Sequence, residues 1–322
     1  MSGAPSRLAG LSAVVPAYRS AESLPLLVAR LEPVLRSLAD RYELVIVDDG
    51  SGDGTADVIA RLCREHDWIQ GIELMRNAGQ HNALLCGIRS ATHDLIVTLD
   101  DDLQNPPEEI PKMLAALDAD VDVVYGAPET EVHGFWRDVA SQVTKIVLQG
   151  ALGASTARMV GPFRVFRTRV RTAFAEYRGT YVNIDVLLTW GTTRFRGVRV
   201  RHEPRAIGVS NYTFRKLLTH SLNMLTGFSA LPLQMASLLG FAMTAVGAGL
   251  LAFVLGRYFL QGVAVPGFAF LASMIIVFSG TQLLTLGIIG EYLARMHFRL
   301  MERPSYTVRG ESRAQGSVTP HE

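Results

Sequence analysis

Through the first half of the chain, short runs of aliphatic and β-branched residues alternate with longer stretches whose apolar residues recur at helical spacing. The short runs predict strands and the longer stretches predict helices. Strands are expected at 12–15, 43–47, 69–75, 95–99 and 121–125, and helices at 23–39, 53–65, 79–90 and 108–117. This alternation predicts an α/β fold, with helices on both faces of a mainly parallel sheet.

Two of the expected strands are apolar almost throughout. LVIV at 44–47 and LIVTL at 95–99 have the composition of central strands that are covered on both faces. In open sheets of this kind, ligands bind beyond the carboxyl ends of the strands. The residues that follow these two strands are strongly acidic, so the functional site is expected there.

The pattern is less regular over residues 126–205. An amphipathic stretch occupies 136–152, and the basic sequence FRGVRVRHEPR at 195–205 predicts a further strand. We assign residues 1–212 to one domain.

The C-terminal third contains two long uncharged runs. No charged residue occurs from 221 to 256, and after Arg257 none occurs until Glu291. Each run exceeds the roughly 20 apolar residues that cross a bilayer. They predict a two-helix transmembrane hairpin over 231–290, with spans at about 233–255 and 268–290. A buried pair of helices in a soluble protein is the alternative.

Basic residues flank this hairpin. Residues 213–230 place Arg215, Lys216 and His220 among leucines, which predicts an interfacial amphipathic helix, with an ordinary surface helix as the alternative. Residues 291–322 form a tail that begins with several arginines. Because the turn between the spans holds only Arg257, the positive-inside rule predicts a multi-pass protein of the plasma (inner) membrane, with its first domain and both termini in the cytoplasm.

Glycines recur within the predicted spans. They lie seven residues apart, which puts each pair on one helix face: Gly240 with Gly247, and Gly280 with Gly287. Small residues let helices approach closely, and they leave room for a homo-oligomer.

Composition narrows the functional classes. A formal net charge of +1 argues against a nucleic-acid partner. The two cysteines, Cys63 and Cys86, do not have metal-site spacing and are expected as reduced core residues of a cytosolic domain. The N-terminus carries no long apolar run ahead of the first strand, so no signal peptide is expected.

The chemistry is expected in two acidic clusters, VDDGSGDG at 47–54 and LDDDLQNPPE at 99–108. Neighbouring carboxylates at strand ends are costly unless they meet a cation or hydrogen-bond donors. Asp100 and Asp102 are therefore candidate ligands of Mg²⁺ or Mn²⁺, and Gln104 adds a neutral oxygen. A solvated acidic turn is the alternative interpretation.

The sequence does not match three other ligand-binding motifs. An EF-hand loop that starts at Asp49 would have Ala60 instead of glutamate at its twelfth position. Thr55 breaks the spacing of a GxGxxG dinucleotide motif, and no Walker A lysine motif occurs.

Six segments in order carry a resemblance: VVPAYR, VDDGSGDGT, RNAGQHNALLCGI, LDDDLQNPPEEI, HEPRAIGVSNYTFRKL and GEYLARMHFRLMERPSYTV. Over residues 12–308 the chain resembles the family 2 glycosyltransferases that act on polyprenyl phosphates. These include dolichyl-phosphate mannose synthases and the transferases that make undecaprenyl-phosphate glucose or 4-deoxy-4-formamido-L-arabinose. The resemblance implies a GT-A type, Rossmann-like nucleotide-sugar-binding domain and inverting transfer from a nucleotide sugar to a polyprenyl phosphate.

The resemblance also implies roles for individual residues. The nucleotide-binding set is Pro16, Ala17, Tyr18, Asp48, Asp49 and Asp100, and the metal set is Asp100, Asp102 and Gln104. The acceptor-phosphate set is Arg137, Ser141, Arg205, Ser210 and Tyr212, and the catalytic set is Asp102, Arg137 and Arg164. Asp185 is a candidate sugar contact, with a structural role as the alternative.

Some segments depart from relatives of the mannose-synthase type. YGAPETEVHGFW lacks their arginine after the fifth strand, and GPFR lacks the acidic residue of GDFR. YRGTYVNIDVLLTWG is closer to the formamido-arabinose transferases.

The residue types suit a reaction without a protein base. A phosphate monoester has a second pKa near 6, so at neutral pH it is already largely a nucleophilic dianion. The protein must instead bring two anions together, which arginines and a metal would permit. Structural or solvent-exposed roles are therefore expected for His81, His93, His133 and His202.

Two other functional classes are left open. A processive polysaccharide synthase would be expected to carry a QxxRW element, where this chain has only LLTWG around Trp190. A catalytically inactive membrane scaffold would fit the altered GPFR motif, but the acidic clusters are intact.

Overall fold

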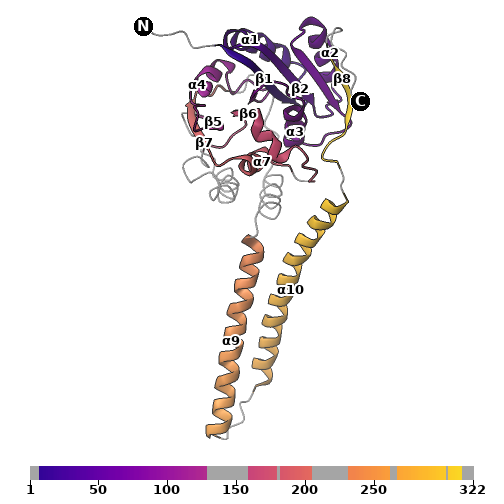
Figure 1. The fold of residues 1–322 in the computed structure, drawn as a ribbon. Coiled ribbons are helices and arrows are strands. Elements are labelled where there is room, and N and C mark those ends of the chain that lie inside the picture. Colours follow the sequence, from indigo (N-terminus) through magenta and orange to yellow (C-terminus); the bar gives the residue numbers. More distant parts are fainter. Residues whose placement is uncertain are drawn as a thin grey trace. The chain divides into compact units, whose positions relative to one another are not determined.

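The computed structural model describes residues 7–128, 159–179, 182–204, 231–261, 267–301 and 304–313. The chain divides into two units. One comprises Met1–Phe214 with Arg303–Glu322 and holds the sheet; the other, Arg215–Glu302, holds two long helices (Figure 1).

The first unit is built on an eight-stranded sheet with the order β7-β5-β6-β4-β1-β2-β3-β8. The strands are β1 (Leu8–Ala17), β2 (Ala39–Asp48), β3 (Ile69–Leu74), β4 (Leu95–Thr98), β5 (Val123–Pro128), β6 (Arg164–Arg167), β7 (Phe195–Val200) and β8 (Val308–Ser312). β4, β1, β2 and β3 are parallel, and β5 is parallel to β7. β6 and β8 are antiparallel to their neighbours. The predicted mainly parallel sheet is confirmed.

Helices cover both faces of this sheet (Figure 1). One apolar core lies under α1 (Ser23–Leu38), α2 (Thr55–Glu65) and α4 (Ile110–Ala115), which follows the 3₁₀ turn η1 (Pro107–Glu109). The other core lies under α3 (Gln80–Ser90), the 3₁₀ segment η2 (Thr168–Phe174) and α7 (Ile184–Gly191). Side chains of a strand alternate between the cores: Ala13 and Val15 belong to the first, and Val14 to the second.

All five predicted strands and all four predicted helices form. The largest change is in β1, which begins at Leu8 instead of residue 12 because Leu8–Leu11 continue the parallel pairing with β2. The helix predicted at 108–117 is divided into η1 and α4. Cys63 and Cys86 are free and buried, one in each core, as expected for reduced core residues.

The segment predicted as a tail contributes to the sheet. β8 pairs antiparallel with β3, where Gly71 is opposite Ser312. Ahead of it, Thr307 O accepts a hydrogen bond from Met75 N at 2.8 Å, and the Tyr306 ring lies 5.9 Å from the Arg89 guanidinium. The chain therefore returns to the first unit after the long helices.

The second unit consists of α9 (Leu231–Gln261) and α10 (Phe268–Leu300). Within the described residues, the segment Pro232–Gly256 is the single one long and apolar enough to cross a membrane. α10 is helical across the second predicted span but continues to Leu300, so a two-span hairpin stays a prediction.

The glycine prediction holds at one position. A Cβ on Gly247 would lie 3.1 Å from Cζ of Phe278, so α9 approaches α10 there. Among the residues that the structure describes, nothing lies within 4 Å of such a Cβ on Gly240, Gly280 or Gly287, so the expected close contact is not seen at these three positions.

Candidate active site

The topology brings three strand ends to one edge of the sheet. β1 pairs with β2 on one side and β4 on the other, so the direction in which strands are added reverses between β1 and β4. Ligands of open α/β sheets bind at the carboxyl ends beside such a reversal. Ala17 is in register with Asp48, and Val14 with Thr98, so the residues after all three strands lie at this edge.

Asp48 and Asp49 close the loop after β2. Asp48 is 2% exposed and accepts hydrogen bonds from both the backbone N–H and the hydroxyl of Ser51. Asp49 is 3% exposed and accepts from the N–H groups of Ala78 and Gly79, at 2.6 and 2.8 Å. Burial raises the pKa of each carboxyl, and these donors oppose the rise. Both buried carboxylates therefore stabilise the conformation of this loop through their hydrogen bonds.

The same loop contains three glycines in the left-handed region. Gly50, Gly52 and Gly54 have φ of 66°, 69° and 88°. At Gly50 a Cβ would lie 2.7 Å from the carbonyl carbon of Arg76, so a side chain has no room. The loop after β2 packs closely against the backbone that follows β3 only because residue 50 is a glycine.

The loops after β1 and β2 are joined by hydrogen bonds. Arg19 N donates to Ser51 Oγ at 2.9 Å, and Ser20 N donates to Thr55 Oγ1 at 3.0 Å. The Tyr18 ring remains 43% exposed, with the Arg19 guanidinium 5.3 Å from its centroid. Of the predicted nucleotide-binding residues, Tyr18 thus has an exposed aromatic side chain.

Asp100 stands first in the acidic triplet after β4. Gln80, at the start of α3, donates from Nε2 to Asp100 Oδ1 at 2.7 Å. Burial and then the negative charges of Asp102 and Asp101 raise the pKa of Asp100 to about 7, and Arg164 and Gln80 oppose the rise only in part. Such uncompensated negative charge marks a place that a cation would stabilise.

Asp102 is held by its own loop. Its Oδ1 accepts the backbone N–H of Gln104 at 3.1 Å, across Leu103, whose φ is +61°. No three acidic, histidine or cysteine side chains converge on a metal position in the part of the chain that the structure describes. Two carboxylates with ligands completed by a diphosphate and water fit Mg²⁺ or Mn²⁺ better than a closed protein cage does.

Arg164 and Asp185 form a buried ion pair that the sequence did not predict. Arg164 Nε and Nη2 donate to the two oxygens of Asp185 at 2.7 and 3.1 Å, and Nη1 donates to Thr98 Oγ1 at 3.2 Å. The two side chains are 2% and 8% exposed. Arg164 therefore has an internal carboxylate as its partner, and its catalytic role stays a prediction. The ion pair fits the structural alternative for Asp185, and a sugar contact by this residue stays a prediction.

Five predicted residues lie outside the described residues: Arg137, Ser141, Arg205, Ser210 and Tyr212. Their roles stay predictions.

Gln80 was missed by the sequence reasoning. It lies in the segment RNAGQHNALLCGI, to which no role was given, and only the fold brings it to Asp100. Its neighbour His81 has a structural contact, as expected: Nδ1 accepts the N–H of Ile184 at 3.3 Å.

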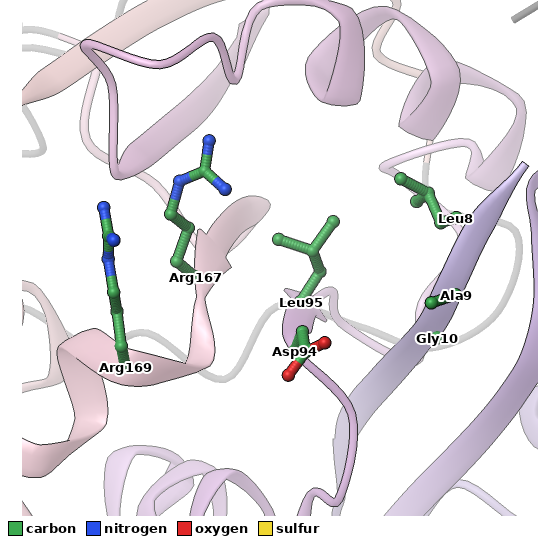
Figure 2. A pocket seen from close by; sticks show the side chains of 7 residues that line it. All are labelled: Leu8, Ala9, Gly10, Asp94, Leu95, Arg167 and Arg169. Carbon is green, nitrogen blue, oxygen red and sulfur yellow. The ribbon is translucent and has the colours of Figure 1, made fainter. Parts of the chain in front are cut away.

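A hollow of about 410 Å³ lies elsewhere (Figure 2). It is lined by Leu8, Ala9, Gly10, Asp94, Leu95, Arg167 and Arg169. These residues include the amino ends of β1 and β4, whereas the acidic loops follow the carboxyl ends. The hollow is therefore separate from the candidate active site.

Comparison with known proteins agrees with this architecture. The family Glycosyl transferase family 2 matches residues 12–174 of 322, from β1 to η2. A structure of glucosyl-3-phosphoglycerate synthase from Mycobacterium tuberculosis, in complex with Mn²⁺, uridine-diphosphate-glucose and phosphoglyceric acid, is 17% identical, with a TM-score of 0.50 over 69% of this chain and 78% of that chain. Mannosyl-3-phosphoglycerate synthase from Rubrobacter xylanophilus is 18% identical, with a TM-score of 0.48 over 80% of this chain and 78% of that chain.

At this identity the first of these structures shows likeness of fold alone, whereas the family match covers both acidic loops. It takes in every strand of the parallel centre of the sheet as well as β5 and β6. The chain belongs to glycosyl transferase family 2 and is a glycosyltransferase.

Proposed function

We propose that this enzyme transfers a sugar, with inversion, from a nucleotide sugar to a polyprenyl phosphate of the undecaprenyl type. The product would be a lipid-linked monosaccharide for the synthesis or modification of cell-envelope glycans. One observation carries the proposal: the same chain holds a family 2 catalytic unit and the apolar helix segment Pro232–Gly256. An enzyme anchored in a bilayer meets a lipid acceptor at the surface where that acceptor resides.

The donor nucleotide would bind over the carboxyl ends of β1 and β2. The exposed Tyr18, which follows the buried Pro16 and Ala17, would form one wall, and the loop that Asp48 and Asp49 hold in shape would form the other. Because both loops are already tied together, little ordering would be needed on binding.

The divalent ion would be held by Asp100 and Asp102, with Gln104 beside them. When bound, Mg²⁺ or Mn²⁺ supplies positive charge to the departing nucleoside diphosphate. Gln80 keeps the Asp100 carboxylate in place, and the Gln104 N–H does the same for Asp102. The buried guanidinium of Arg164 adds a fixed positive charge that opposes the rise in the pKa of Asp100.

The acceptor would attack as a phosphate dianion, which needs no protein base. Arg137 and Arg205, with Ser141, Ser210 and Tyr212, would bind it and offset the repulsion between the two anionic substrates. In-line displacement of the diphosphate by the phosphate oxygen inverts the anomeric centre. The phosphate oxygen to anomeric carbon bond forms as the bond from that carbon to the diphosphate breaks.

The basic residues around the helices give the orientation that we propose. The enzyme would lie in the plasma (inner) membrane with its catalytic unit and both termini in the cytoplasm, where nucleotide sugars are made.

A transfer assay tests the proposal. The purified full-length chain in detergent is incubated with undecaprenyl phosphate, Mn²⁺ and radiolabelled UDP-, GDP- or dTDP-sugars in turn. We expect one donor to give a solvent-extractable, mild-acid-labile labelled lipid, and none without the lipid phosphate. Label that passes to a soluble phosphate ester such as phosphoglycerate, but never to the lipid, would refute the acceptor class.

A further inference from the structure

Arg30, on α1, joins two carboxylates from distant parts of the catalytic unit. Its Nε and Nη2 donate to the two oxygens of Glu108 at 3.1 and 2.8 Å. Its Nη1 donates to Glu203 Oε2 at 2.9 Å, and Nη2 also reaches Glu203 Oε1 at 3.3 Å. A guanidinium is suited to such a double fork, because its donors lie in one plane with fixed angles.

Both acidic residues are connected to the loop that follows β4 through their backbones. Glu203 donates its backbone N–H to Gln104 O at 2.9 Å, while the Gln104 N–H donates to Asp102 Oδ1 at 3.1 Å. Glu108 lies in η1, which ends the same loop. Arg30 therefore holds the loop 103–107 at two points, through Glu203 at Gln104 and through Glu108 at its end.

This loop needs external support. Leu103 adopts a φ of +61°, a conformation disfavoured for a branched side chain, and Pro106 and Pro107 provide no N–H for backbone hydrogen bonds. A second ion pair also supports the end of this loop: Arg201 Nε donates to Glu109 Oε1 at 2.7 Å. The contacts from α1 and from the segment after β7 thus fix a turn whose own backbone bonding is sparse.

We infer that Arg30 is a positioning residue that holds the Asp102 carboxylate ready for the divalent ion, acting through Glu203 and Gln104. The inference rests on the proposed function. The Arg30, Glu108 and Glu203 side chains are 32%, 40% and 42% exposed, and ion pairs at such positions contribute little to global stability. The effect of Arg30 should therefore appear in metal binding more than in unfolding.

The test measures Mn²⁺ affinity directly. Full-length protein in detergent is titrated with Mn²⁺, alone and with UDP or GDP, and free Mn²⁺ is followed by electron paramagnetic resonance. Removal of a group that orients a metal ligand commonly weakens binding about 10–100-fold. Because Arg30 acts through two intermediates, we expect Arg30→Ala to weaken Mn²⁺ binding about tenfold. Arg30→Lys keeps the charge but loses the fork, so it should recover only part of the affinity.

Arg36→Ala is the matched control. Arg36 lies on the same helix and is paired with a carboxylate, that of Glu32, at the next turn. We expect its Mn²⁺ affinity to equal that of the wild type. If Arg36→Ala weakens binding as much as Arg30→Ala does, the effect is a general loss of charge and the inference is wrong.

A double-mutant cycle tests whether Arg30 acts on the metal site through Glu203. If Arg30 acts through Glu203, the loss in Arg30→Ala with Glu203→Gln should be smaller than the product of the two single losses. Arg30→Ala with wild-type Mn²⁺ affinity, whatever its thermal midpoint, overturns the inference while sugar transfer stands. A wild-type chain that neither binds Mn²⁺ nor transfers sugar refutes the proposed function itself.

Discussion

The carboxylates of Asp100 and Asp102 are held by different donors, and this difference separates their roles. Asp100 accepts from the side chain of Gln80 and lies near the buried charge of Arg164, whereas Asp102 accepts the backbone N–H of Gln104 in its own loop. The position of the Asp102 carboxylate thus depends on the conformation of this loop.

Asp102→Ala should lower sugar transfer by about two to three orders of magnitude, because the ion that neutralises the departing diphosphate loses a ligand. The protein should remain folded and membrane-bound. Initial rates with labelled donor and undecaprenyl phosphate measure the effect. Asp57→Ala, an exposed carboxylate on α2, is the control and should leave the rate unchanged. Near-normal activity of Asp102→Ala would refute the metal assignment.

Arg164→Met should lower the free energy of unfolding by about 3–5 kcal/mol, because it leaves the Asp185 carboxylate buried without its cation. Arg164→Met combined with Asp185→Leu should be less destabilising than Arg164→Met alone. Thermal unfolding of the detergent-solubilised chain measures both. An Arg164→Met variant with an unchanged thermal midpoint that has lost sugar transfer would instead support the catalytic role that the resemblance implies.

At the scale of single residues, the sequence predicts where the acidic residues lie but not which side chains they contact. Asp48, Asp49, Asp100 and Asp102 could be placed because they follow strands, and strand ends are visible in hydropathy. The pairing of Arg164 with Asp185 could not, because it joins β6 to α7 and neither neighbourhood carries a local signal of it. The contact between Gln80 and Asp100 could not be predicted for the same reason.

Among the elements, the glycine-containing loop after β2 allows two substitutions, at Gly50 and at Gly52, to be compared. Gly50→Ala and Gly52→Ala both force a side chain to a positive φ, which costs about 1–2 kcal/mol. Only at Gly50 does the new Cβ also meet backbone, 2.7 Å from Arg76 C; at Gly52 nothing lies within 4 Å. Gly50→Ala should therefore weaken donor binding and stability clearly more than Gly52→Ala. Calorimetric titration with UDP-, GDP- and dTDP-sugars, together with thermal midpoints, measures this, and equal effects would contradict it.

Asp122 joins the ends of three elements outside the catalytic loops. It is 3% exposed and accepts from Arg169 Nη2 at 2.7 Å, Arg194 Nε at 2.9 Å and Thr192 Oγ1 at 2.8 Å. Burial alone would raise the pKa of its carboxyl, but these bonds lower it below the ordinary value of 3.8. The charged form is thus the one the fold stabilises.

Asp122→Asn should lower the free energy of unfolding at neutral pH by about 1–3 kcal/mol. Because the folded pKa lies below the unfolded one, the stabilisation is present above the unfolded pKa and is lost as pH falls through the folded pKa. The gap between wild type and variant should therefore close below about pH 4. Thermal midpoints across pH measure this, with the exposed Asp120→Asn as control. A gap that stays constant down to pH 3 would contradict the assignment.

The elements themselves were largely predictable. The parallel strands and their helices carry strong local patterns, and the basic strand at 195–205 appears as β7. β8 was not predicted, because VRGES has no apolar run and becomes a strand only by pairing with the free edge of β3. Tertiary contact, rather than propensity, determines such an edge strand.

For the whole molecule, β8 makes the end of the described chain part of the catalytic unit. Truncation after residue 303 should expose the edge of β3, lower the thermal midpoint and favour association through that edge. Truncation after residue 313, which keeps β8, is the matched control and should behave as the full chain. Thermal unfolding and sedimentation in detergent measure both. Equal behaviour of the two truncations would show that β8 adds no stability.

The position of β8 also sets an order of events during synthesis. The ribosome makes β1 to β7 first and β8 only after all of α9 and α10, so β3 stays unpaired on one side while the apolar helices emerge. Domains generally begin to fold from the N-terminus as they are made. The nascent enzyme would therefore hold an incomplete sheet throughout synthesis of its two long helices, and chaperone dependence should be greatest in that interval.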